Sequence, residues 1–216
     1  MQPEPMSRPD WLAPLIEGLR SPGPVPFLVP PADQVDGLRA AAVLALFGEG
    51  PHGPDVLLLQ RSADMRSHPG QPAFPGGRID PSDHGPIGAA LREAQEETGL
   101  DPDGVDVLGS LPELWLPPSG NGVTPVIGWW RAPSEVGPAD PAEVETVARV
   151  PIADLVDPAN RVTVRHPLGH TSPAFRVANM LVWGFTAGVL SWLLVLAGWE
   201  REWDRSIVEP LPSVLR

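Results

Sequence analysis

Residues 91–100 of this 216-residue chain read Leu91-Arg92-Glu93-Ala94-Gln95-Glu96-Glu97-Thr98-Gly99-Leu100. We expect one helix over Pro86–Thr98, because proline suits the first helical position and the glycine that follows suits the left-handed residue just past a helix end. At 3.6 residues per turn, Glu93, Glu96 and Glu97 fall within an arc of about 100°. The helix therefore carries three carboxylates on one flank.

A separate apolar stripe of this helix should dock against a sheet. Its members are Ile87, Ala90, Leu91, Ala94 and Thr98. The acidic flank is costly for a purely structural helix, because like charges one turn apart destabilise it by roughly 0.2–0.5 kcal/mol per pair. A hard divalent cation such as Mg²⁺ or Mn²⁺, which prefers oxygen ligands, would offset this repulsion. The alternative is a solvated acidic face, since charge runs commonly lie on surfaces.

The charge balance limits the partners. The formal net charge is −12, and arginine supplies all 15 basic residues. A protein this acidic has no general attraction for DNA, RNA or anionic membranes, so we expect no nucleic-acid partner. A phosphorylated ligand would need a local arginine cluster or bound divalent cations. Cysteine is absent, which excludes disulfides and thiolate metal sites. The first nine residues show no secretory signal pattern, so a cytoplasmic location is the expectation.

Three parts are expected along the chain. Residues 1–36 form an N-terminal arm, in which apolar residues from Trp11 to Leu19 recur at helical spacing and a proline-rich linker follows. Residues 37–200 form one domain, and residues 201–216 form a C-terminal tail. Apolar runs bounded by glycine and proline predict strands at 40–47, 56–60, 105–108, 123–131 and 144–150. A hairpin turn at 48–54, a loop at 62–81, a short helical turn at 151–155 and a second long helix at 180–196 complete the prediction.

Strands and helices are mixed without a regular βαβ rhythm, which favours the α+β class or an α/β/α sandwich. Residues 180–199 lack charge over the length of a membrane span. A buried or dimer-interface helix is the favoured interpretation, because polar side chains interrupt the run. We therefore expect no membrane association and leave a homodimer open.

The residues around the acidic helix carry a family resemblance. The stretch Phe74-Pro75-Gly76-Gly77 precedes the helix, and Arg92-Glu93-x-x-Glu96-Glu97-x-Gly99-Leu100 ends it. Together they resemble the Nudix box. The resemblance implies an α/β/α sandwich around a mixed β-sheet, dependence on Mg²⁺ or Mn²⁺, and hydrolysis of a nucleoside diphosphate linked to another moiety.

The resemblance also implies roles for individual residues. Glu93 and Glu97 are expected to ligate the cation, together with the carbonyl of Gly77, and Glu96 is either a further ligand or the base. Arg92 is expected to orient a glutamate by hydrogen bonding. The usual glutamate upstream is replaced by Asp83, with eight rather than seven residues before the arginine, so Asp83 is either a substitute acid or a polar residue near the helix start. A more distal candidate acid is Glu143.

A second motif lies upstream and resembles that of the coenzyme A diphosphatase subfamily. It reads Leu58-Leu59-Gln60-Arg61-Ser62-x-x-x-Arg66-x-x-x-Gly70-x-x-x-Phe74-Pro75-Gly76-Gly77. The likeness implies cleavage of CoA or acyl-CoA to 3′,5′-ADP and (acyl-)4′-phosphopantetheine. Arg61 and Arg66 are candidate substrate-binding residues, because a guanidinium grips phosphate oxygens with two hydrogen bonds. The alternatives are NADH, ADP-ribose or another nucleoside diphosphate derivative as substrate, or a catalytically silent ligand-binding module.

Overall fold

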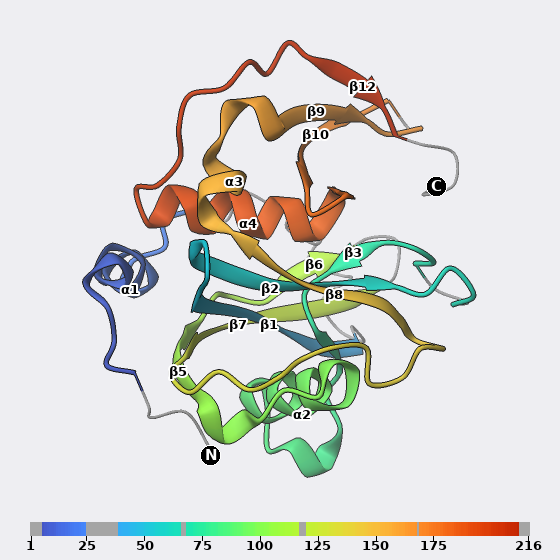
Figure 1. The fold of residues 1–216 in the computed structure, drawn as a ribbon. Helices are drawn as coiled ribbons and strands as arrows, with labels where there is room; N and C mark the ends of the chain where they lie inside the picture. Colours follow the sequence, from blue (N-terminus) through green and yellow to red (C-terminus); the bar gives the residue numbers. More distant parts are fainter. Residues whose placement is uncertain (1–5, 25–38, 66–67, 117–119, 168, 212–216) are drawn as a thin grey trace.

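The computed structural model describes residues 6–24, 39–65, 68–116, 120–167 and 169–211. A large mixed sheet occupies the centre (Figure 1). Its strands are β1 (Arg39–Gly50), β2 (Gly53–Arg61), β3 (Pro72–Ala73), β4 (Gly76–Arg78), β5 (Val105–Ser110), β6 (Leu114–Leu116), β7 (Asn121–Trp130) and β8 (Val144–Pro151). The main path runs β3-β2-β1-β7-β5, while β4 pairs with β1, β6 with β7 and β8 with β2.

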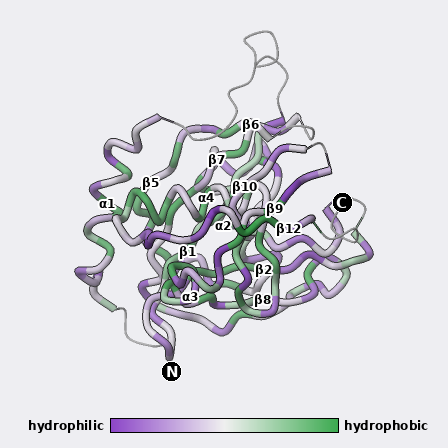
Figure 2. Tube along the Cα trace, turned by 90° about the horizontal axis from the view of Figure 1, so that it is seen from above, coloured by the Kyte–Doolittle hydropathy of each residue, from purple (hydrophilic) through white to green (hydrophobic). Residues whose placement is uncertain are grey.

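The central strands are buried on both faces. β1 pairs in parallel with β7 and antiparallel with β2 and β4. Along β1, Leu44 and Leu46 belong to one core cluster, whereas Ala45 and Phe47 belong to the other. Successive side chains of a strand point to opposite faces, so a strand covered on both sides is apolar at nearly every position. This explains the continuous apolar run at 40–47. Hydrophobic stretches coincide with strands such as β2 and β5 in Figure 2.

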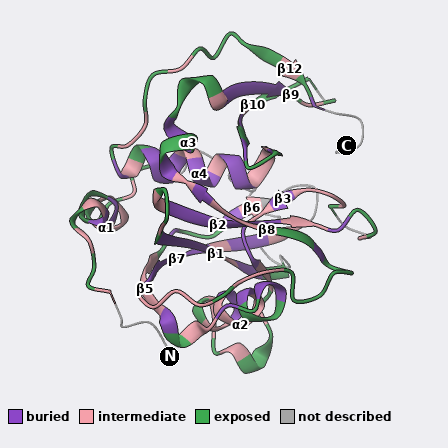
Figure 3. Ribbon diagram, viewed as in Figure 1, coloured by how far each residue is buried: buried purple, intermediate pink, exposed green. Residues whose placement is uncertain are grey.

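Helices cover the two faces of this sheet. α2 (Pro86–Thr98) lies on one face, and α3 (Ile152–Val156) and α4 (Gly184–Leu196) lie on the other (Figure 1). Short 3-10 turns join several elements, namely η1 (Asp10–Leu12), η3 (Pro81–Asp83), η4 (Pro102–Gly104) and η5 (Pro158–Asn160). The predicted α+β class, with an α/β/α sandwich around a mixed sheet, is confirmed. Figure 3 shows the buried residues gathered where strands and helices meet.

The predicted helix at 180–196 is wrong over its first residues. Met180–Val182 form strand β11, which pairs with β10 (Thr171–Val177), and the helix begins only at Gly184. Ala178 and Asn179 form the turn, both with positive φ, as two-residue hairpin turns require. An apolar run does not by its periodicity distinguish a buried strand from a buried helix. Within the described residues, no helix is both long and apolar enough to cross a membrane.

A second, smaller sheet was not predicted. Its order is β11-β10-β9-β12, with β9 at Arg161–Arg165 and β12 at Val208–Pro210. β12 pairs in parallel with β9, so part of the predicted C-terminal tail is held by a sheet. The loop predicted at 62–81 likewise contains the short strands β3 and β4.

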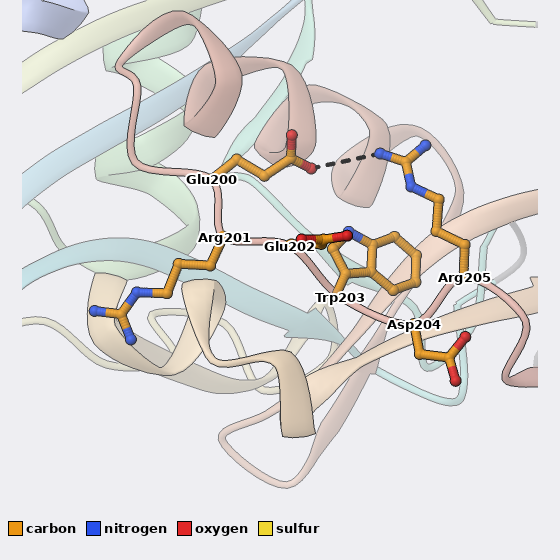
Figure 4. A pocket seen from close by; sticks show the side chains of 6 residues that line it. All are labelled: Glu200, Arg201, Glu202, Trp203, Asp204 and Arg205. Carbon is orange, nitrogen blue, oxygen red and sulfur yellow. Dashed lines mark ion pairs between the residues drawn. The ribbon is translucent and has the colours of Figure 1, made fainter.

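Arg161 ties the segment after α4 to the second sheet. Its guanidinium lies between the rings of Phe175 and Trp203, 4.2 and 4.7 Å from their centroids. Glu200 lies 3.8 Å away and forms an ion pair with it. Burial lowers the pKa of Arg161 to about 10. The residues around Trp203 surround an open hollow, with an ion pair between Glu200 and Arg205 (Figure 4). None of the predicted site residues that the structure describes lines this hollow.

The helix predicted near the N-terminus is confirmed as α1 (Ala13–Arg20). Leu12 and Leu15 are fully buried and belong to the same core cluster as residues of α4 and β7. The indole of Trp11 packs against Trp129 and donates a hydrogen bond to Glu49 at 2.9 Å. The division of the chain at residues 36 and 200 stays a prediction, and the proline-rich linker lies mostly outside the described residues.

Leu15→Ala should lower the free energy of unfolding by about 2–5 kcal/mol, because it opens a cavity in the shared core. Urea denaturation followed by tryptophan fluorescence measures this change. Glu17→Ala, at an exposed position of the same helix, is the matched control and should stay within about 0.5 kcal/mol of the parent. Equal stability of the Leu15 variant and the control would show that α1 contributes nothing to the core.

Candidate active site

Helix α2 has the predicted bounds and ending. It spans Pro86–Thr98, and Gly99 follows with φ 71°, its N–H donating to the carbonyl of Gln95. This left-handed conformation is one that glycine adopts without steric cost. The predicted apolar stripe is partly wrong, because Ile87 is exposed and Ala89 is buried. The helix is therefore rotated slightly relative to the predicted docking face.

This rotation places the three glutamates of α2 in different surroundings. The side chain of Glu97 is 5% exposed, that of Glu93 is 19% exposed and that of Glu96 is 58% exposed. Burial of a carboxylate is unfavourable unless hydrogen bonds or cations compensate it. The partners of Glu97 and Glu93 therefore define the candidate site.

Glu97 contacts both sequence motifs. Its Oε2 accepts a hydrogen bond from the backbone N–H of Gly76 at 2.9 Å, and its Oε1 lies 3.5 Å from Nη1 of Arg61. Burial raises the pKa of Glu97 to about 7, because desolvation outweighs the stabilising effects of the Gly76 hydrogen bond and the Arg61 charge. The carboxylate thus lacks enough positive charge around it to be fully stabilised as an anion.

Glu93 lies directly against strand β4. A Cβ atom at position 77 would overlap the carboxylate of Glu93, so only glycine leaves room for this close approach. β4 is paired with β1 through Gly77↔Ala42, which fixes the backbone at this point. Burial also raises the pKa of Glu93, although its hydrogen bond from Arg92 acts in the opposite direction.

Arg92 lies at the centre of an acidic cluster. Its guanidinium donates to Glu93 at 2.9 Å, to Glu96 at 2.8 Å and to the backbone carbonyl of Arg78 at 3.1 Å. Asp83 accepts two hydrogen bonds from it, from Nε at 2.7 Å and from Nη2 at 3.1 Å. This two-point contact fixes the orientation of a planar guanidinium, which a single contact does not do.

Asp83 has a structural partner as well. Its carboxylate accepts the backbone N–H of Asp80, while Asp80 accepts the N–H of Ser82, so the two acids cap η3 reciprocally. The hydrogen bond from Arg92 lowers the pKa of Asp83. The sequence did not identify the role of Asp80, although an acid followed three positions later by another acid is a pattern typical of such caps.

The residues fit a divalent cation in donor chemistry. Glu93, Glu97 and the backbone of β4 offer oxygen atoms, and burial raises the pKa of both carboxylates. Among the described residues, no group of three or more acidic or histidine side chains forms a complete metal site. Mg²⁺ commonly takes one or two carboxylates and completes its shell with water and substrate phosphates, so a partial set of protein ligands suits it.

The predicted distal acid, Glu143, lies apart from α2. Glu143 is exposed, and its backbone carbonyl accepts the N–H of Ser62 at 2.8 Å. Its negative charge contributes to the raised pKa of Glu97, so it lies near the site. Arg66 lies outside the described residues.

The fold and the box residues agree with comparisons to known proteins. The model of the NUDIX domain family matches residues 37–169, and the chain therefore belongs to the Nudix family. Nudix hydrolases act on nucleoside diphosphate derivatives and generally use divalent metal ions. The chain is an enzyme of this class.

Individual relatives support the same assignment. The chain is 40% identical over 167 residues to the uncharacterized Nudix hydrolase NudL of Cronobacter sakazakii, covering 74% of this chain and 83% of the relative. It is 39% identical to the Escherichia coli K12 protein of the same description, with the same coverage. The crystal structure of the M. smegmatis Nudix hydrolase RenU matches with a TM-score of 0.53 and 23% identity, covering 77% of this chain and 90% of that one. That last likeness shows a shared fold.

Asp83→Ala should weaken Mn²⁺ binding about 10- to 100-fold, the usual effect of removing an outer partner of a metal ligand. The physical reason is that Arg92 loses its two-point anchor and no longer fixes Glu93. Isothermal titration with Mn²⁺ measures this. Asp204→Ala removes a turn-capping carboxylate at an exposed position and should leave the affinity unchanged. Equal affinities in both variants would show that Asp83 only caps its own turn.

Proposed function

We propose that this Nudix hydrolase cleaves the diphosphate bond of coenzyme A or acyl-CoA with Mg²⁺ or Mn²⁺, giving 3′,5′-ADP and (acyl-)4′-phosphopantetheine. The observation that carries the proposal is the contact between Arg61 and Glu97, 3.5 Å apart. Arg61 belongs to the upstream motif that resembles the CoA diphosphatase subfamily, and Glu97 belongs to the Nudix box. The two motifs thus meet at one point.

In this proposal Glu93, Glu97 and the carbonyl of Gly77 hold the cation, and Glu96 is a further ligand or the base. When bound, the cation would neutralise diphosphate charge and would make a water molecule a better nucleophile. Burial of Glu97 and its hydrogen bond to the Gly76 N–H fix one oxygen donor in place. A fixed donor costs little reorganisation during the reaction. Arg92 orients Glu93 and does not need to touch the substrate.

Arg61 is the proposed partner of a substrate phosphate. Its 3.5 Å contact with Glu97 is at the outer limit of a hydrogen bond. Its Nε is buried and has no hydrogen-bond partner among the described residues. This side chain therefore retains donor capacity for a phosphate. Coenzyme A carries a 3′-phosphate besides its diphosphate, so its binding site needs more cationic donors than a site for ADP-ribose does. The arginines of the upstream motif therefore support coenzyme A as the substrate.

Glu97→Gln and Glu93→Gln should each lower kcat by two or more orders of magnitude, on the scale seen when one charge-stabilising group is removed from an active site. Each substitution keeps the side-chain shape and removes the negative charge that a cation requires. Initial rates at saturating Mn²⁺, with circular dichroism to verify folding, measure the effect. Glu202→Gln, at an exposed position beside the hollow of Figure 4, should leave kcat unchanged. Full activity of both site variants would exclude the proposed ligands.

A substrate panel tests the specificity. CoA, acetyl-CoA, dephospho-CoA, NADH and ADP-ribose are incubated with Mg²⁺ or Mn²⁺. Chromatography follows the adenosine product, which is 3′,5′-ADP from CoA and acetyl-CoA and AMP from the other three. We expect CoA and acetyl-CoA to have the highest kcat/KM. Arg61→Ala should lower kcat/KM for CoA by about 10- to 100-fold, the effect of losing a charge-assisted hydrogen bond. Turnover of NADH or ADP-ribose without turnover of CoA would refute the CoA proposal, and turnover of none would favour a ligand-binding module.

A further inference from the structure

A hydrogen bond connects helix α4 to the loop that leads into the candidate site. The hydroxyl of Thr186, in the first turn of α4, donates to the backbone carbonyl of Pro72 at 3.1 Å. Thr186 is 6% exposed, so water does not readily replace this contact. α4 and α2 cover opposite faces of the sheet (Figure 1). The hydrogen bond therefore connects α4, which lies on the face of the sheet opposite α2, to strand β3, which precedes the candidate site along the chain.

The chain from Pro72 to Gly76 is short and anchored at successive positions. Pro72 lies in β3, opposite Gln60 of β2. The side chain of Phe74 is buried in the core cluster that also contains residues of β2 and α4, and the carbonyl of Pro75 accepts the N–H of Leu44 at 2.8 Å. Gly76 then donates its N–H to Glu97. Four residues span at most about 14 Å, so little slack separates the α4 contact from the Glu97 contact.

The following residue is also part of the site. Gly77 lies against the carboxylate of Glu93. A shift of β3 along β2 would thus pull on the N–H that holds Glu97 and on the backbone next to Glu93, against the pairing of β4 with β1. Hydrogen bonds of the sheet alone fix β3 weakly, because it has only two residues and one of them is proline, which has no N–H to donate. The hydroxyl of Thr186 supplies an additional anchor on the other side.

We propose that Thr186 is a positioning residue of the hydrolase: through the Pro72 carbonyl it fixes β3, and so holds Gly76 and Gly77 against the carboxylates of α2. This inference rests on the candidate site proposed above and is independent of which nucleotide the enzyme cleaves. It assigns a role to Thr186, one of the two polar side chains, with Ser191, that interrupt the otherwise apolar α4. The methyl group of Thr186 contributes packing, and the hydroxyl contributes position.

Thr186→Val and Thr186→Ser separate these two contributions. The valine variant keeps the side-chain shape and loses the donor, whereas the serine variant keeps the donor and loses the methyl group. We expect Thr186→Val to lower kcat and Mn²⁺ affinity about 10- to 100-fold, as outer partners of metal ligands do, with little change in KM. In Thr186→Ser, kcat and Mn²⁺ affinity should both stay within about threefold of the parent values, because the hydroxyl that fixes β3 is retained.

Hydrogen exchange at the Gly76 amide gives a readout that needs neither metal nor substrate. Exchange should be faster in Thr186→Val than in the parent and near the parent rate in Thr186→Ser. Ser191→Ala is the matched control, because it removes a hydroxyl of the same helix that contacts Arg161 and not β3. Its kcat, Mn²⁺ affinity and Gly76 exchange should equal those of the parent.

The outcomes separate the two proposals. If the parent cleaves another nucleotide and not CoA, the CoA proposal fails, while the comparison of valine and serine variants on that nucleotide still judges Thr186. Parent-like kcat, Mn²⁺ affinity and Gly76 exchange in Thr186→Val overturn the positioning role. So does an equal loss in both variants, because packing would then be the whole contribution. If Thr186→Val does not fold, Thr186→Ser decides: parent-like Gly76 exchange supports the role, and accelerated exchange contradicts it.

Discussion

The candidate site depends on one buried carboxylate, that of Glu97, held against the backbone N–H of Gly76. Placing a carboxylate in the interior raises its pKa to about 7, because the surrounding atoms solvate the charge less well than water does. The N–H of Gly76 and the charge of Arg61 offset this cost only in part. What remains is an unsatisfied demand for positive charge at a defined point. In the proposed function, a cation and the substrate phosphates that accompany it would supply that charge.

The residues around Glu97 fix the position of its neighbours in the candidate site. Glycine at position 77 lets Glu93 lie against β4, and β4 is aligned by its pairing with β1. On the outer side, Asp83 fixes Arg92 with two hydrogen bonds, and Arg92 in turn contacts Glu93 and Glu96. Rigid strands therefore position one side of the site, and a network of charges positions the other.

Local features of the site were predictable from the sequence, whereas its three-dimensional environment was not. Helix α2, with its proline start and glycine end, follows from short-range backbone preferences. The unequal burial of Glu93, Glu96 and Glu97 does not, because a helical period gives the arc of a stripe but not the rotation at which the helix docks. The second sheet was missed since Met180–Val182 form part of one apolar run with α4. The contact between Arg61 and Glu97 joins residues 36 positions apart and is visible only in the folded chain.

The parallel pairing of β1 with β7 has a consequence for how the enzyme assembles. Its register joins Arg39 to Asn121 and Phe47 to Trp129, so the ladder forms only after a chain segment of about 80 residues has closed into a loop, a slow step governed by topology. The β1–β2 hairpin and α2 consist of sequence neighbours and need no such closure. The ends of that long segment thus meet late during folding. Until they do, newly made chains expose the apolar faces of both strands. During this time aggregation competes with the completion of folding.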